Sequence, residues 1–534
     1  MSIWWGLFAV LHLTVKGFHK IRHKVDLVRV QLQQIIAPIY LITKISLILN
    51  IVLMPKKGLR DLIMSSSAPN AIQDLNMQNL NIQSFAEKVI QEHHLPAVSI
   101  AVWKDGQLYQ GAAGILNVDT AVEATTDSIF QIGSITKVFT TVLMMKLVDR
   151  GLVDLDKPVK HYLRDFEVAD IKATQSITVK QLLNHSNGIA GDYFPDDQDE
   201  DGPHIARYVL RCSQLPLVHP VGDGFSYSNA AFAIAGRLIE VVSGISWFDA
   251  MEEWIYKPLG MQQAICRPAD VIRFRAALGH LPNTDNPDQY HTCSGRYLSL
   301  GQSPAGTTPT MTAADLIAFG RAHLEGGLTQ SGDRWLSEES VLAMQTPTND
   351  VPVTSTALKA ATGLGWSVSQ HNQSGLKMVA HTGGTNGQCA ILRLFPEHNA
   401  CFVVLMNRQK LDALVGIANT LTKTITDVDL TVAPVQITSS VNLTPEQLQP
   451  YVAHYHAYAG DYYVTLGSNG LDVVFDDAVD EEEPSRGTLN PIGDECFEEK
   501  DSLGVTRGII RFMKPNSEGQ PDRLFAAGRL FQRQ

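Results

Sequence analysis

The chain has 534 residues, more than one typical domain, so two folded units plus further segments are expected. Hydrophobic residues make up 44% of the chain and charged residues 18%, which is typical of a globular protein with a sizeable core. The formal net charge of −12 argues against a nucleic-acid-binding surface. The six cysteines form no Cys-x-x-Cys pair, which argues against a zinc knuckle or a thioredoxin-like site and favours buried thiols.

Residues 1–64 form a hydrophobic and basic N-terminal segment. Within it, Ile35 to Met54 is rich in Ile and Leu and carries one charge, Lys44. A central lysine costs about 2.5–3.5 kcal/mol on an insertion scale, and each Ile, Leu or Val returns about 0.3–0.6 kcal/mol, so insertion is marginally favourable. Lys and Arg are more frequent before this stretch than directly after it. The pattern predicts a membrane anchor with the rest of the chain periplasmic or extracellular; the alternative is a cytoplasmic amphipathic extension.

Residues 75–427 predict one α+β domain in which both chain ends contribute strands to the same sheet. Residues 65–70 are a linker by composition, and two strands around Asp105-Gly106 predict a hairpin. Helical patterns dominate 134–260. The remaining elements expected are helices at 85–92 and 411–424, and strands at 362–370, 377–380, 388–395 and 401–407.

Residues 440–534 predict a second unit, a small antiparallel β-barrel. It follows a linker at 427–445 and contains short strand patterns at 462–466, 471–475, 509–513 and 523–527, separated by turns. The acidic tract from Asp476 to Glu483 is expected to be a solvated loop. Because linker and barrel are separable in the sequence, a chain lacking 440–534 is expected to fold and to act on an altered range of substrates.

The first chemical motif is Ser134-Ile-Thr-Lys137, at the start of an apolar run that ends near Gly151. So few charges indicate a helix buried in the middle of its domain. Residues three apart are neighbours on a helix, so Lys137 lies beside the Ser134 hydroxyl, and a buried lysine of lowered pKa is a base for a serine nucleophile. The motif alone is weak, because Ser134 could be a simple N-cap.

Two further motifs lie downstream. In Gly224-Phe-Ser-Tyr227-Ser-Asn229, the tyrosine can relay a proton and Asn229 can hold a substrate amide; a core tyrosine and an N-cap are the alternative. In Ala380-His381-Thr-Gly383-Gly384, glycines let a strand backbone approach a ligand and direct an N–H at a developing oxyanion. His381 alone would more often be structural.

Together, Ser-x-x-Lys, Tyr-Ser-Asn and His-Thr-Gly in this order resemble the motifs of serine β-lactamases, penicillin-binding proteins and their esterase and D-aminopeptidase relatives. The class C β-lactamase-like group is most similar. The resemblance covers about residues 75–425. Residues 440–534 are similar to the lipocalin-like barrels attached to some of these enzymes. Other matching stretches are 154–163, 177–189, Pro258-Leu-Gly-Met261 and Gly363-Leu-Gly-Trp366.

The resemblance implies a β-lactamase/transpeptidase-like fold and a role for each motif residue. Ser134 would be the nucleophile, Lys137 its base, and Tyr227 the second acid/base. Asn229, His381 and Gly383 would contact the substrate, and the N–H groups of Ser134 and Gly384 would form the oxyanion hole. No metal or other cofactor is implied.

His381 departs from the β-lactamase pattern, where a lysine stands at this position. With an unperturbed pKa of about 6.5, His381 predicts a weak, pH-dependent preference for substrates with a free carboxylate.

The sequence therefore predicts a serine hydrolase that forms an acyl-enzyme and acts on amide or ester bonds, as a peptidase, an amidase or an esterase. β-Lactamase activity is a minor alternative. The alternative from another class is a non-catalytic relative that binds peptide or cell-wall fragments. The expected partners are a small-molecule or peptide substrate and, through the anchor, a membrane.

Overall fold

A computed structural model describes residues 80–197, 202–283, 286–352, 358–430 and 443–534, the last range with short gaps at 469, 478–483, 494, 503, 505 and 518. The predicted membrane anchor, the linker at 65–70, and most of the linker at 427–445 and of the acidic tract lie outside the described residues. Among those described, no single helix is long and apolar enough to cross a membrane, and one bent pair, Asn229–Ser243 with Trp247–Tyr256, passes by length and composition alone.

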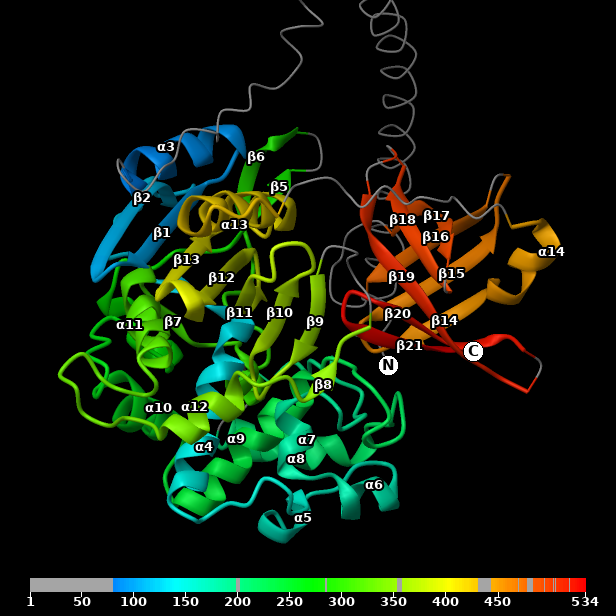
Figure 1. Ribbon diagram of the computed structural model, residues 1–534, viewed down its shortest axis with the longest axis horizontal. Helices are drawn as coiled ribbons and strands as arrows, with labels where there is room; N and C mark the ends of the chain where they lie inside the picture. The colour runs from blue at the N-terminus through cyan, green and yellow to red at the C-terminus, as the bar shows by residue number, and fades with distance from the viewer. Residues whose placement is uncertain are drawn as a thin grey trace, which may run out of the picture. The chain divides into compact units, whose positions relative to one another are not determined.

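A nine-stranded antiparallel sheet forms the centre of the catalytic domain, in the order β3-β2-β1-β13-β12-β11-β10-β9-β8. Strand β1 pairs with β13 through Val102 and Phe402, so the two ends of the domain share one sheet, as predicted (Figure 1). The strands are β1 Ala97–Lys104, β2 Gln107–Asn117, β3 Val122–Glu123, β8 Asn349–Asp350, β9 Leu358–Thr362, β10 Ser367–His371, β11 Lys377–Thr385, β12 Gln388–Phe395 and β13 Ala400–Met406.

The β1–β2 hairpin turns at Asp105-Gly106, where both residues have positive φ, as the sequence predicted. The single strand predicted at 362–370 is wrong, because the chain turns between β9 and β10. Gly365 adopts φ +73°, and Gly363 allows the carbonyl of Met344 to lie where a Cβ would be only 2.1 Å away. The two glycines therefore end one strand before the next begins.

Helices pack against this sheet and fill the other half of the domain. Helix α3 (Ile82–Glu92) packs on β1 and β2, α13 (Leu411–Thr426) packs on β12 and β13, and α11 (Ala313–Leu324) packs on β1, β12 and β13. The other helices are α4 Thr136–Asp149, α5 Val159–Tyr162, α6 Ile171–Ser176, α7 Val179–Leu183, α8 His204–Arg211, α9 Asn229–Ser243, α10 Trp247–Met251 and α12 Glu338–Met344.

Helix α4 is the most enclosed helix of the site region. All its residues from Thr136 to Met145 are buried, and Phe139 stacks on Phe319 of α11 at a centroid distance of 3.8 Å. The prediction of a helix apolar on all sides and buried within its domain is confirmed. This enclosure fixes the start of α4, which carries the predicted nucleophile.

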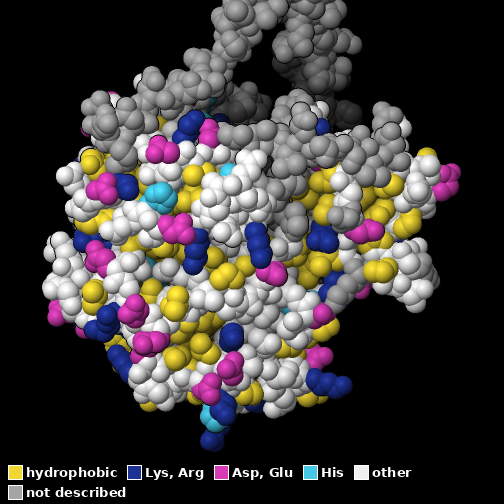
Figure 2. Space-filling view, in the orientation of Figure 1, with side chains coloured by type: hydrophobic (Ala, Val, Ile, Leu, Met, Phe, Trp, Pro, Cys, Tyr) yellow, Lys and Arg dark blue, Asp and Glu magenta, His cyan; other side chains and the backbone are white. Residues whose placement is uncertain are grey.

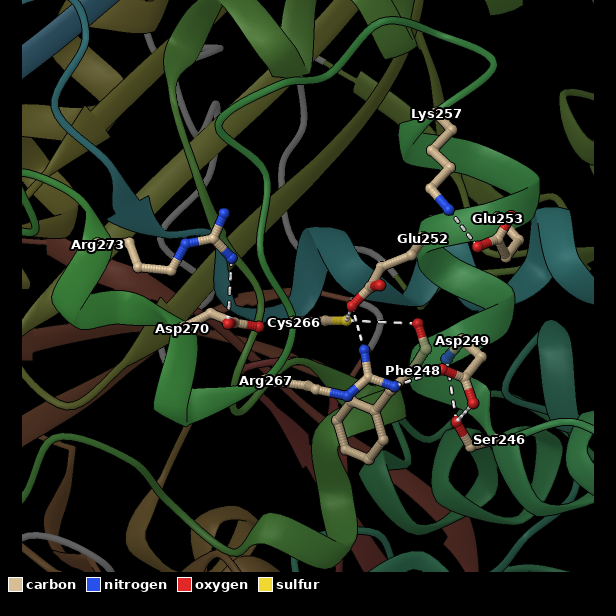
Figure 3. A network of polar contacts seen from close by, with 10 residues as sticks. All are labelled: Ser246, Phe248, Asp249, Glu252, Glu253, Lys257, Cys266, Arg267, Asp270 and Arg273. Carbon is tan, nitrogen blue, oxygen red and sulfur yellow. Dashed lines mark hydrogen bonds and ion pairs between the residues drawn. The ribbon is translucent and has the colours of Figure 1, made fainter.

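A polar network ties α10 to the segment that supports the entry to α4 (Figure 3). Arg267 donates to Asp249 at 2.6 Å and also contacts Glu252. Two residues earlier, Ile265 forms a bridge with Thr310 of β7 (Thr310–Met311), and β7 pairs with β4 (Phe130–Gln131). Since β4 directly precedes Ser134, this network supports the strand that delivers the nucleophile.

The C-terminal unit is a closed barrel of eight antiparallel strands, which confirms the predicted fold class. Aromatic side chains, among them Tyr455, Phe497 and Phe512, fill its interior. Helix α14 (Pro445–Leu448) precedes it. The strands are β14 Ala453–Ala457, β15 Gly460–Leu466, β16 Leu471–Asp477, β17 Ser485–Gly493, β18 Cys496–Asp501, β19 Thr506–Pro515, β20 Pro521–Ala526 and β21 Arg529–Arg533.

The described surface carries charges of both signs. On the face that Figure 2 shows, Lys and Arg are interspersed with Asp and Glu rather than gathered in one basic patch. Cys212, Cys266, Cys389 and Cys401 are buried free thiols, as the composition predicted.

Candidate active site

Ser134 lies in a short 3-10 turn, Gly133–Ile135, immediately before α4. Gly133 has φ +52°, and a Cβ built there would lie 2.7 Å from the backbone nitrogen of Gly384. Glycine is therefore required, both for its backbone conformation and for the close approach of β11. Ser134 therefore lies just before the N-terminal end of α4, where the apolar run of the sequence begins.

Lys137 lies beside Ser134, as the three-residue spacing predicted. Its Nζ is 3.0 Å from Ser134 Oγ, 2.7 Å from Asn229 Oδ1 and 2.7 Å from the carbonyl oxygen of Ala305. An amide or carbonyl oxygen can only accept, so these two oxygens take the two N–H groups of a neutral amine. The nitrogen lone pair then faces the Ser134 hydroxyl, which is the arrangement that a general base needs.

The surroundings of Lys137 favour this neutral form. The side chain is fully buried, and burial lowers its pKa well below the usual value. The positive charge of Arg529 lowers the pKa further, and the negative charge of Asp192 opposes the shift. Desolvation is therefore the main cause of the lowered pKa of this predicted base, and the neighbouring charges are the smaller cause.

The Tyr227 ring is close to both the base and a cation from the C-terminal barrel. Its ring centroid is 4.8 Å from Lys137 Nζ and 4.9 Å from the guanidinium carbon of Arg529, and His185 stacks on it at 4.4 Å. Burial raises the pKa of Tyr227, and its hydroxyl hydrogen-bonds Ser134, which partly offsets the rise. A neutral tyrosine beside the nucleophile can donate a proton to a leaving group.

Asn229 is the first residue of α9, and both the oxygen and the nitrogen of its side-chain amide form hydrogen bonds. Oδ1 accepts from Lys137, and Nδ2 donates to Asp192 Oδ1 at 2.7 Å. The side chain thus contacts the base directly, in addition to the substrate contact that the sequence predicts.

The third motif lies on β11, beyond the point where its neighbour ends. Within the described ladder, pairing with β10 stops at Ala380 and Ser367, so the backbone from His381 onward is open on that side. A Cβ at Gly383 would lie 1.9 Å from the carbonyl oxygen of Ile132, which brings the two backbones into contact. A Cβ there would also lie 3.1 Å from Ser134 N, so the N–H groups of Ser134 and Gly384, which the sequence predicts to form the oxyanion hole, belong to closely approaching backbone segments.

His381 is buried and its ring centroid lies 6.3 Å from that of Tyr227. Its Nδ1 is 2.6 Å from the carbonyl oxygen of Thr382, which can only accept, so Nδ1 carries the proton. Burial is the main cause that lowers the pKa of His381 to about 3, and the nearby Lys137 side chain lowers it further. The expectation of a histidine that titrates near pH 6.5 is therefore corrected.

The ratio of kcat/KM for a carboxylate substrate to kcat/KM for its neutral counterpart should consequently stay constant over the working pH range. With a folded-state pKa near 3, His381 remains neutral from pH 5.5 to 8.5 and adds no charge that varies. The measurement is kcat/KM for a matched carboxylate substrate and its neutral methyl ester, in wild type and in the exposed control His161→Gln. A ratio that rises more than about threefold on acidification and loses that rise in His381→Gln would contradict this prediction.

Two residues that the sequence did not single out join the predicted set. Asp192 is buried after α7, and Arg529 begins β21 of the barrel. The guanidinium donates from Nε to Asp192 Oδ2 at 2.8 Å and from Nη2 to Oδ1 at 3.2 Å. Asp192 closely follows the recognised stretch that ends at Ile189, a local signal that could have been used; Arg529 carries no such signal.

The barrel also contacts the site through its backbone and through an apolar cluster. The Tyr227 N–H donates to the Gly528 carbonyl at 2.9 Å, and Leu530 N–H donates to Ser226 Oγ at 3.3 Å. The cluster at the junction of the two units consists of Ala190, Val218, Phe225, Phe525 and Leu530.

Known proteins are similar to this chain in sequence and in fold. The Beta-lactamase family profile matches residues 82–424. Penicillin-binding protein 4 of Amycolatopsis lactamdurans is 35% identical over 316 residues, 59% of this chain and 82% of that protein. The unguisins hydrolase ungD' of Aspergillus campestris is 27% identical over 61% of this chain, and the chain spans only 61% of that relative.

A solved structure extends the similarity beyond the catalytic domain. The crystal structure of SurE superimposes with a TM-score of 0.68 at 25% sequence identity, covering 88% of this chain and 100% of that one. With a family match over more than half of its length, the chain belongs to the beta-lactamase family and has the serine hydrolase fold of that family.

Proposed function

We propose that the protein hydrolyses amide or ester bonds of peptide-like substrates through an acyl-enzyme on Ser134. The observation that carries the proposal is the Lys137 amine, buried and directed at Ser134 Oγ from 3.0 Å. A lone pair at hydrogen-bond distance from a serine hydroxyl can accept its proton as the oxygen attacks.

The reaction then proceeds in two steps. Ser134 Oγ bonds to the substrate carbonyl carbon while Lys137 takes the hydroxyl proton, and the oxyanion is stabilised by the N–H groups of Ser134 and Gly384. Tyr227 gives a proton to the departing amine or alcohol, which leaves the acyl group on Ser134. A water molecule then attacks this ester while Tyr227 accepts its proton, Lys137 returns its proton to the departing Ser134 Oγ, and the carboxylic acid is released.

Peptide-like substrates with a D-residue are the class we propose. Support comes from relatives: a penicillin-binding protein, a hydrolase of unguisins, and SurE, which has also been crystallised with D-Leu at 25% identity and a TM-score of 0.67. The site is compatible with either leaving group, because Tyr227 can protonate an amine or an alcohol. Amidase and esterase activity therefore belong to the same proposal.

Active-site labelling and a substrate panel test this function. The full chain should react with a fluorophosphonate probe, Ser134→Ala should not, and the exposed control Ser213→Ala should react like wild type. Turnover is then measured on small esters, D- and L-amino acid p-nitroanilides and a chromogenic cephalosporin. Labelling that persists in Ser134→Ala would overturn the proposal, and labelling without steady-state turnover would indicate the binding relative instead.

A further inference from the structure

A continuous line of hydrogen bonds leads from the C-terminal barrel to the nucleophile. Arg529 of β21 holds Asp192 by two bonds of 2.8 and 3.2 Å, and Asp192 Oδ1 accepts from Asn229 Nδ2 at 2.7 Å. Asn229 Oδ1 accepts from Lys137 at 2.7 Å, and Lys137 lies 3.0 Å from Ser134 Oγ. Each of these distances is within the normal range for a direct hydrogen bond.

Asp192, next to the barrel, determines which groups donate and which accept along this chain of hydrogen bonds. A carboxylate can only accept, so Asp192 requires the NH2 side of the Asn229 amide, and the amide oxygen must then point to Lys137. A rotated amide would place N–H groups against the lysine amine and leave Asp192 without its donor. Asp192 itself is buried, and Arg529 supplies its charged partner.

We propose that Arg529 and Asp192 are positioning residues: through Asn229 they orient the Lys137 amine, so that the barrel completes the general base of the catalytic domain. This inference rests on the proposed acyl-enzyme function. It assigns the C-terminal barrel a direct part in catalysis rather than a role limited to admitting substrates.

The charges of Arg529 and Asp192 shift the pKa of Lys137 in directions that an experiment can measure. Arg529 lowers the pKa of Lys137 and Asp192 raises it. The other titratable groups that face the amine are Tyr227, whose pKa is raised, and His185 and His381, whose pKa values are lowered, so all three stay neutral. The two members of the ion pair therefore act on the base in opposite directions.

The pH profile of kcat/KM on a neutral ester separates this role from a merely structural one. Activity requires neutral Lys137, so the acidic limb follows its pKa. Arg529→Met removes a cation, which should raise that pKa and move the limb to higher pH by about 0.5 unit or more. Asp192→Asn keeps an acceptor for Asn229 but removes the anion, so its limb should move to lower pH.

Orientation is tested with a second set of variants. Asp192→Ala removes the acceptor and should lower kcat by about 10- to 100-fold with little change in KM, because the base loses its alignment. Arg529→Lys should recover part of the kcat lost in Arg529→Met. Arg486→Met, an exposed arginine of the same barrel, is the matched control, and fluorophosphonate titration counts the folded active sites in each variant.

Two acidic limbs that stay in place, or that move in the same direction, would overturn the inference while leaving the proposed function intact. A wild-type protein that the probe does not label at Ser134 would overturn the proposed function itself. A kcat of Asp192→Ala equal to that of wild type, per titrated site, would also count against the positioning role.

Discussion

Ser134→Ala should abolish turnover, and Lys137→Ala should lower kcat by at least about 10³-fold. The first change removes the atom that attacks the substrate. The second removes the amine that lies 3.0 Å from Ser134 Oγ, and no other described amine hydrogen-bonds this hydroxyl. The measurement is kcat on the best ester of the panel, with active sites counted by the probe where Ser134 is present.

Lys146→Ala provides the matched control, because Lys146 is the second lysine of α4 and is partly buried, whereas Lys137 is fully buried. Its Nζ contacts the Trp335 carbonyl, away from the nucleophile, so kcat should stay within about twofold of wild type. Turnover of Ser134→Ala close to that of wild type would contradict the whole mechanism, and turnover of Lys137→Ala at that level would assign the base to another group.

Deleting residues 440–534 should both destabilise and inactivate the protein. The deletion exposes Phe225 and Val218 of the apolar junction, and uncovering such side chains costs about 1.5–3 kcal/mol each. It also removes Arg529 and the carbonyl that accepts the Tyr227 N–H. We expect kcat/KM to fall by at least about 100-fold and the Tm to fall by several degrees. Because of these contacts, we expect the catalytic domain to need the barrel, in place of the expectation from the sequence that the barrel is separable.

Solubility and catalysis can be separated in the shortened chain. Adding Phe225→Ser there should reduce aggregation by removing the exposed aromatic side chain, without restoring activity. A shortened chain that is stable and hydrolyses the small ester at the wild-type rate would show that the barrel supplies nothing to the catalytic machinery.

The parts of this fold that the sequence predicted are those recorded in local patterns. Asp105-Gly106 needs only the turn preference of its own two residues, and the uninterrupted apolar run after Ser134 specifies a buried helix. The three motifs identified Ser134, Lys137 and Tyr227 because their spacing resembles a known family.

The residues that escaped prediction depend on distant contacts or on burial. Arg529 and Asp192 are 337 positions apart, and no local sequence pattern near either residue predicts that the two form an ion pair. The pKa of His381 could not be inferred from its type, because desolvation in the folded site sets it. The break at Gly363 and Gly365 depends on the neighbouring Met344 carbonyl, which the sequence does not place.

The pairing of β1 with β13 has a consequence for how the chain is made. Val102 and Phe402 are neighbours in the sheet, yet 300 positions separate them in the sequence. At about 5–20 residues per second, the ribosome needs about 15–60 s to synthesise the intervening chain, during which the apolar edge of β1 has no strand to pair with. The β1–β13 pair can form only after β13 has emerged from the ribosome. A high yield of folded protein therefore requires that the early β1–β2 hairpin does not pair with other chains during translation.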